Sequence, residues 1–153
     1  MTVNIITEEL LQDIRMKSHL ECETIPDVEE RYKYEAGTEK RDEVSRSIIR
    51  AVATARGVLV RFLEPDFSDF ASNLPEIPEE FCFQFHISER RLAGRTQQIA
   101  DRLHSYIVDL TLGYYYTSCN KLDFAKTHTD MAAGECMQIE SLLYTKLPPI
   151  FKF

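Results

Sequence analysis

Several residue types and patterns that mark common protein classes are scarce in this chain of 153 residues. It has no tryptophan, only five glycines and only four cysteines. The glycines do not cluster, so the sequence has no glycine-rich phosphate-binding loop. The cysteines are spaced too widely for a disulfide framework or a CxxC metal site. We interpret them as reduced and mostly buried, as in cytoplasmic proteins. They are Cys22, Cys82, Cys119 and Cys136.

Positive charge and long apolar runs are also scarce. The chain has 18 basic and 25 acidic residues, a net charge of −7. Dedicated nucleic-acid or anionic-membrane binding needs a cationic surface, so we expect neither. No apolar run approaches the roughly 18 residues of a membrane span. Ile5 and Ile6 are followed at once by Glu8 and Glu9, which is unlike a secretion signal. We therefore expect a cytoplasmic protein.

Helical periodicity, in contrast, is abundant. A chain of this length with 44% hydrophobic residues can bury one core, so we expect a single helical domain over residues 1–153. Thr7 and Thr96 are expected to cap the first and third helices. A shorter helical stretch is expected over 27–34. Apolar residues recurring at three- and four-residue steps predict four principal helices, over about 7–19, 40–63, 96–118 and 122–144.

One segment follows a different period. Phe81, Phe83 and Phe85 alternate with polar or smaller residues up to Ser88, which predicts a half-buried strand. A lone strand is not stable, so this one must pair either within the chain or with another subunit. The predicted fold class is therefore mainly α, a helical bundle of about four principal helices with one short β element near 81–88.

Catalytic and metal-binding motifs are missing from the sequence. A metal site needs several ligands at short spacings, and the closest pairs, Asp101 with His104 and His19 with Cys22, each stand alone. There is no GxSxG or HExxH motif. We expect no enzymatic activity, no metal and no cofactor. The histidines are interpreted as partly buried structural residues; they are His19, His86, His104 and His128.

Three arginines gather in a turn between the predicted strand and the third helix. Arg90, Arg91 and Arg95 lie close together in an otherwise acidic protein. Guanidinium groups bind carboxylates and phosphates through two parallel hydrogen bonds, so the turn is a candidate docking point. The alternative is a solvated turn whose arginines balance nearby carboxylates.

Aromatic residues supply two further candidate contact surfaces. Tyr114, Tyr115 and Tyr116 point around the end of the third helix, which favours either a contact surface or a wide core there. Phe67 and Phe70 lie in a loop that contains prolines. They attach this loop either to the core or to a neighbouring subunit.

The distribution of charge suggests how subunits would meet. Residues 8–43 contain 12 acidic and 6 basic residues, whereas the arginine turn is basic. In a head-to-tail ring the same two unlike surfaces meet at every contact. Opposite charges speed and orient such encounters more than they tighten them. Self-association or docking of a partner is therefore expected, and a monomer with an internal acid–base contact is the alternative.

The order of these segments resembles a known family. Ile6-Thr7-Glu8-Glu9-Leu10 opens a short helix, a long alanine-bearing helix runs from Asp42 to Leu63, and a later helix runs from Ile99 to Tyr114-Tyr115-Tyr116. This plan resembles the small helical head–tail connector (neck, head-completion) proteins of tailed bacteriophages and prophages. The resemblance implies a ring-forming structural protein without a cofactor, located in the virion or the cytoplasm. Its partners would be itself and the portal, neck or tail proteins. The alternative is an intracellular helical adaptor or regulatory domain that binds one partner protein.

Overall fold

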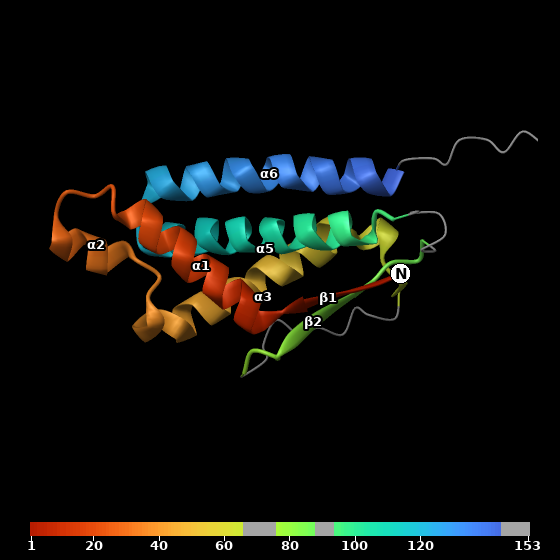
Figure 1. Cartoon of the computed structure of the whole chain (residues 1–153), viewed down its shortest axis with the longest axis horizontal. Coiled ribbons are helices and arrows are strands. Elements are labelled where there is room, and N and C mark those ends of the chain that lie inside the picture. Colours follow the sequence, from red (N-terminus) through yellow and green to blue (C-terminus); the bar gives the residue numbers. More distant parts are fainter. Residues whose placement is uncertain (66–75, 88–93, 145–153) are drawn as a thin grey trace, which may run out of the picture.

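The computed structural model describes residues 1–65, 76–87 and 94–144. The predicted fold class is confirmed: four long helices and one two-stranded antiparallel sheet make up most of the described chain (Figure 1). The elements in chain order are β1 (Thr2–Ile6), α1 (Thr7–Cys22), α2 (Val28–Tyr34), η1 (Thr38–Lys40), α3 (Arg41–Val58), η2 (Val60–Phe62), β2 (Glu80–Gln84), α5 (Thr96–Ser118) and α6 (Leu122–Tyr144).

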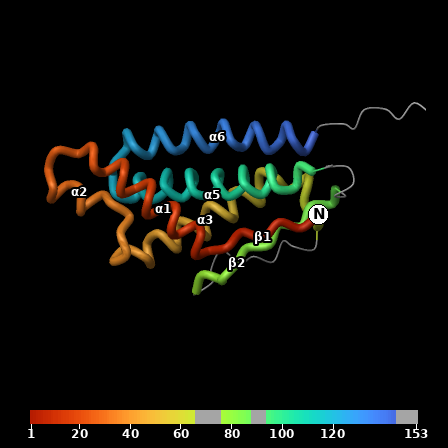
Figure 2. Tube along the Cα trace, viewed as in Figure 1, coloured from red at the N-terminus to blue at the C-terminus, as the bar shows by residue number. Residues whose placement is uncertain are grey.

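The central element is α5. It packs against α6 on one side and against α3, α1 and β1 on others (Figures 1 and 2). Every residue from 106 to 113 is buried, whichever way its side chain points. A helix that is buried all round is the core element of its domain. Any polar side chain in this stretch must therefore find its partner inside the protein.

α6 runs antiparallel to α5 along the outside of the bundle (Figure 2). The turn between them contains Asn120, whose φ of 61° lies in the left-handed region that asparagine tolerates better than most residues. The two helices approach closely at Gly113, where an added Cβ would lie 3.0 Å from Thr129 Oγ1. α6 packs chiefly on α5, so its opposite face is open to solvent.

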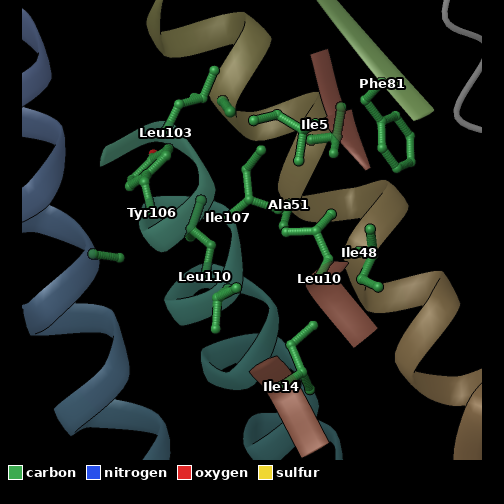
Figure 3. Close-up of a cluster of buried hydrophobic side chains, with 14 of the residues drawn as sticks. Ile5, Leu10, Ile14, Ile48, Ala51, Phe81, Leu103, Tyr106, Ile107 and Leu110 are labelled. Carbon is green, nitrogen blue, oxygen red and sulfur yellow. The ribbon is translucent and has the colours of Figure 1, made fainter. Parts of the chain in front are cut away.

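Apolar side chains from all the long helices and both strands form one core cluster. Figure 3 shows Ile5, Leu10, Ile48 and Phe81 converging with the α5 residues Leu103 and Ile107. The stripe predicted for the second helix is confirmed as buried; its members are Val44, Ile48, Val52, Ala55, Leu59 and Phe62.

The predicted strand is confirmed as β2, and its partner lies within the chain. β1 pairs with it antiparallel, with Val3 opposite Phe83 and Ile5 opposite Phe81. All four side chains are buried on the same face of this ribbon. The N-terminal amino group adds bonds to the carbonyls of Phe85 and Ile87 at 3.1 and 3.2 Å. We did not predict β1 from the sequence.

The predicted caps are wrong. Thr7 and Thr96 are each the first residue of their helix, and the residues before them make no side-chain cap bond. β1 continues directly into α1, so Ile6 occupies the cap position as the last strand residue. The Thr7 hydroxyl instead donates to the Pro78 carbonyl at 2.5 Å. Arg95 already has helical backbone angles, which leaves Thr96 inside α5.

We expect the β ribbon to contribute strongly to stability through Phe83. Its ring is fully buried, and the Arg56 guanidinium lies 4.9 Å from the ring centroid. Phe83→Ala should lower the free energy of unfolding by about 3–5 kcal/mol, because it leaves a cavity in the core. Glu80→Ala, at an exposed position of the same strand, should change the free energy of unfolding by less than about 0.5 kcal/mol. Urea denaturation measures both, and equal effects would contradict the packing described here.

Candidate functional site

Several residues predicted from the sequence to form contacts lie outside the described part of the chain. These are Arg90, Arg91, Phe67 and Phe70. Arg95 is described; it is half-buried and directly precedes the first turn of α5. The arginine turn and the proline-bearing loop therefore remain predictions.

The tyrosines at the end of α5 need a correction. Tyr115 and Tyr116 are fully buried, so neither can form the predicted contact surface in this structure. Their hydroxyls donate inside the protein, to the Glu35 carbonyl at 3.1 Å and to Ser18 Oγ at 3.0 Å. The alternative, a wide core at the bundle end, is correct for these two, because α1 and α6 contact Tyr116 while Glu35 and Lys40 contact Tyr115. Tyr114 is half-buried, and the Arg50 guanidinium lies 4.1 Å from its ring centroid.

The most unusual feature of the bundle is a polar cluster between α1, α5 and α6, centred on His128. The His128 Nδ1 atom lies 3.0 Å from Asp109 Oδ1 on α5, and its Nε2 atom lies 2.5 Å from Glu21 Oε2 on α1. Asp109 is fully buried and His128 nearly so. Tyr116 stacks on the imidazole at a centroid distance of 5.7 Å. Three helices thus meet at one histidine.

The partners of His128 determine its protonation state. A neutral imidazole donates from one nitrogen only, whereas both nitrogens here face carboxylate oxygens. Both bonds form only if both nitrogens carry protons. Burial alone would lower the pKa of His128, but the bonds to Asp109 and Glu21 outweigh burial and raise it to about 9. His128 is therefore a cation at neutral pH.

A second proton lies between two carboxyl groups. Asp109 Oδ2 and Glu135 Oε2 are buried, and among the described residues neither has a donor. The two carboxyl groups bond each other when one of them is protonated, and the proton belongs on Glu135. Burial, followed by this bond to Asp109, raises the pKa of Glu135 to about 8. Burial opposes ionisation of Asp109 as well, but bonds from His128 and Glu135 and the charge of Lys17 lower the pKa of Asp109.

With these two protons bound, the charges of the cluster cancel. Lys17 lies 3.4 Å from Asp109 Oδ1, so Lys17 and His128 balance Asp109 and Glu21 while Glu135 is neutral. Such compensation is required where water cannot reach, because an isolated buried charge costs several kcal/mol. The cluster is a neutral network that joins three helices.

The cluster is not arranged for acid–base or nucleophilic chemistry. Both nitrogens of His128 are occupied by carboxylates, so the ring cannot take a proton from a substrate. The Cys22 thiol lies 4.0 Å from the Tyr116 hydroxyl, and burial raises its pKa, which disfavours the nucleophilic thiolate. The geometry therefore favours a structural role.

Two open grooves flank the N-terminal half of α5. The first has a volume of about 610 Å³ between α5 and α6, and Glu135 and Arg102 line it. The second has a volume of about 520 Å³ between β1, α1 and α5. Inside the second groove, His104 pairs with Asp13 at 2.6 Å.

Two other site types are not found in the described residues. No group of three or more histidine, cysteine or acidic side chains there is arranged to hold a metal ion. The helices among them are also too short or too polar to cross a membrane.

Sequence reasoning missed the cluster because its members are far apart along the chain. His128 is 19 residues from Asp109 and 107 residues from Glu21. One local signal was present. Asp109 lies beside core positions of α5, and His128 lies on the inner stripe of α6 between Ala125 and Ala132. Polar residues at core positions indicate a buried network, although they do not identify the partners.

The chain was also compared with known proteins. No protein-family model, no curated protein and no solved structure matches it.

We expect His128 to be essential for the stability of the bundle. Replacing it with leucine leaves the Glu21 carboxylate without its donor and Asp109 with only the 3.4 Å contact from Lys17, and breaking a buried ion pair costs about 3–5 kcal/mol. His19→Leu is a matched control, because His19 also lies between two carboxylates, Glu23 and Glu35, but is exposed. Urea unfolding midpoints should fall sharply for His128→Leu and hardly move for His19→Leu. Similar small shifts in both variants would rule out the network.

Proposed function

We propose that this protein is an assembly subunit of the head–tail connector kind that its sequence resembles, and that it acts by binding further copies of itself. The observation that carries this proposal is the outer face of α6. This face contains a partly apolar surface whose exposed residues carry no charge.

From Met131 to its end, α6 has no charged residue at an exposed position; Glu135 and Glu140 are half-buried. We call the exposed positions of this segment the α6 strip, and Met137 within it is 72% exposed. Charged residues make up 28% of the whole chain, so their absence from an exposed helical face is unusual. The centre of a protein interface is typically depleted of charged residues and enriched in methionine and tyrosine. The α6 strip consists of Met131, Ala133, Gly134, Met137, Gln138, Ser141 and Tyr144.

Gly134 supports the same interpretation. A helix with glycine at an interior position is less stable than the same helix with alanine there, by roughly 1 kcal/mol. An added Cβ at Gly134 would meet nothing within 4 Å, so packing within the described chain does not require glycine there. A missing side chain on an exposed helix does allow the backbone of a neighbouring molecule to approach closely.

A second apolar surface lies on α1. Met16 and Leu20 are one helical turn apart, and they are 55% and 59% exposed. We call these residues the α1 pair. Head-to-tail assembly needs two unlike surfaces on each subunit, which meet at every contact. In the proposed contact, the α6 strip of one copy covers the α1 pair of the next, and burial of the methionines and Leu20 supplies the affinity.

A complementation experiment tests this contact. Met137→Glu damages the α6 strip, and Leu20→Glu damages the α1 pair. The parent should grow in mass with concentration in analytical ultracentrifugation, and each variant alone should be monomeric because a buried, unpaired glutamate is costly. Mixing the two variants should give a one-to-one dimer, because the intact α6 strip of Leu20→Glu can bind the intact α1 pair of Met137→Glu. Thr127→Glu, on the exposed face of α6 outside the strip, is the control and should assemble like the parent.

Other outcomes point to other modes of action. If Leu20→Glu assembles as well as the parent does, the contact is symmetric and does not involve the α1 pair. If the parent is monomeric even at millimolar concentration in high salt, where its net charge of −7 is screened, self-assembly is excluded. The adaptor that binds a different protein would then be the better hypothesis.

Gly134 provides an independent prediction. Gly134→Ala should raise the free energy of unfolding of the subunit by about 0.5–1 kcal/mol, because alanine is the better helix former. The added methyl group should also weaken self-association at the α6 strip. Gly57→Ala on α3 is the control: a Cβ there also meets nothing within 4 Å, and its substitution should leave association unchanged. Thermal unfolding and sedimentation measure the two effects, and unaltered association in Gly134→Ala would place the contact elsewhere.

A further inference from the structure

The two halves of α6 are attached to the bundle by different means. In the C-terminal half, Ile139 and Leu143 are buried in the core. In the N-terminal half, the fully buried apolar side chains are only those of Ala125 and Ala132, which bury little area. The half-buried ring of Phe124 adds an edge contact with Tyr116 at a centroid distance of 5.3 Å. The polar cluster around His128 supplies the buried ion pairs and hydrogen bonds that attach this half.

That attachment needs two protons for geometric reasons. His128 has a carboxylate at each ring nitrogen, and Asp109 and Glu135 have facing carboxyl groups without another donor among the described residues. We propose that these two protons, one on His128 and one shared by Asp109 and Glu135, hold the N-terminal half of α6 on the bundle, and that this half detaches when both are lost. This inference concerns attachment within one chain and is independent of the proposed assembly.

Loss of the protons changes the charge of the cluster from neutral to strongly negative. Without them, Lys17 faces three carboxylates, and the neutral imidazole satisfies only one of its two acceptors. Detachment of α6 lets water reach these groups, so it relieves the repulsion. The titratable and charged groups around the two protons come from all three helices: Lys17, Glu21 and Cys22 on α1, Arg102, Asp109 and Tyr116 on α5, and His128 and Glu135 on α6.

The pH range follows from the direction of each shift. The pKa of His128 is raised from 6.5 to about 9, and that of Glu135 from 4.5 to about 8. Both groups therefore stabilise the attached state fully in acid and lose this effect as the pH rises through their raised values. The pKa of Asp109 is lowered, so its contribution is lost only below its ordinary value of 3.8. Between pH 6.5 and 8 the attached state holds most of both protons, whereas the detached state holds none on Glu135 and half or less of one on His128.

Amide hydrogen exchange tests the proposal directly. After correction for intrinsic exchange, protection of α6 amides in residues 124–135 should fall by up to a hundredfold per pH unit between pH 6.5 and 8, because two protons leave on detachment. In Glu135→Gln, a neutral amide takes the place of the protonated acid, so the fall should be at most tenfold per unit. α3 amides should show a smaller change in both proteins. The protein is measured at a dilution where sedimentation shows a monomer, so that assembly cannot protect α6.

Controls separate this mechanism from a general effect of pH. Glu140→Gln makes the same chemical change on the same helix, outside the cluster. Protection of its α6 amides should fall with pH as steeply as in the parent protein. Lys17→Met leaves the helices intact but removes a cation that favours ionisation of Asp109 and Glu135, so the loss of protection should move to higher pH. Equal slopes in the parent and Glu135→Gln, or an unmoved transition in Lys17→Met, would overturn the proposal.

Discussion

The complete burial of the middle of α5 is the constraint on which the rest of this structure depends. Because α1, α3, α6 and β1 enclose this helix, a polar residue at position 109 cannot reach solvent. Asp109 is nevertheless there, and its ionised side chain needs compensating charge and hydrogen bonds. His128, Lys17 and Glu135 supply them from the two flanking helices. The polar cluster is thus the consequence of placing one carboxylate in the centre of a bundle.

The same constraint gives α6 an unusual distribution of residues. Its inner face carries His128 and Glu135, whereas its outer face exposes Met131 and Met137 and, over its C-terminal half, no charge. Helices at the edge of a bundle usually have the opposite arrangement, with charge outside and apolar residues inside. An outer helix with an uncharged exposed face is suited to contact another molecule.

Local patterns determined how much could be predicted from the sequence. The long helices and the Phe81–Phe85 alternation were predictable because periodicity is read over neighbouring residues. β1 was missed because its five residues join α1 without a turn, so its alternation of Val3 and Ile5 is short. The contacts of His128 and the burial of Tyr115 and Tyr116 depend on which helices surround α5. Information of that kind comes from tertiary packing, which a single sequence does not reveal.

The polar cluster also helps to fix the rotation of the N-terminal half of α6 about the helix axis. The fully buried apolar side chains of this half are only two alanines, so apolar burial alone holds its inner face weakly. Only one rotation about the helix axis places His128 between Asp109 and Glu21 and brings Glu135 to Asp109. Every other rotation leaves Asp109 with Lys17 as its one remaining partner in the cluster, and the loss of the buried ion pair with His128 costs several kcal/mol. The cluster therefore selects which face of α6 turns inward, as polar core residues do in coiled coils. By fixing that choice, it keeps the α6 strip on the outside, where another subunit can reach it.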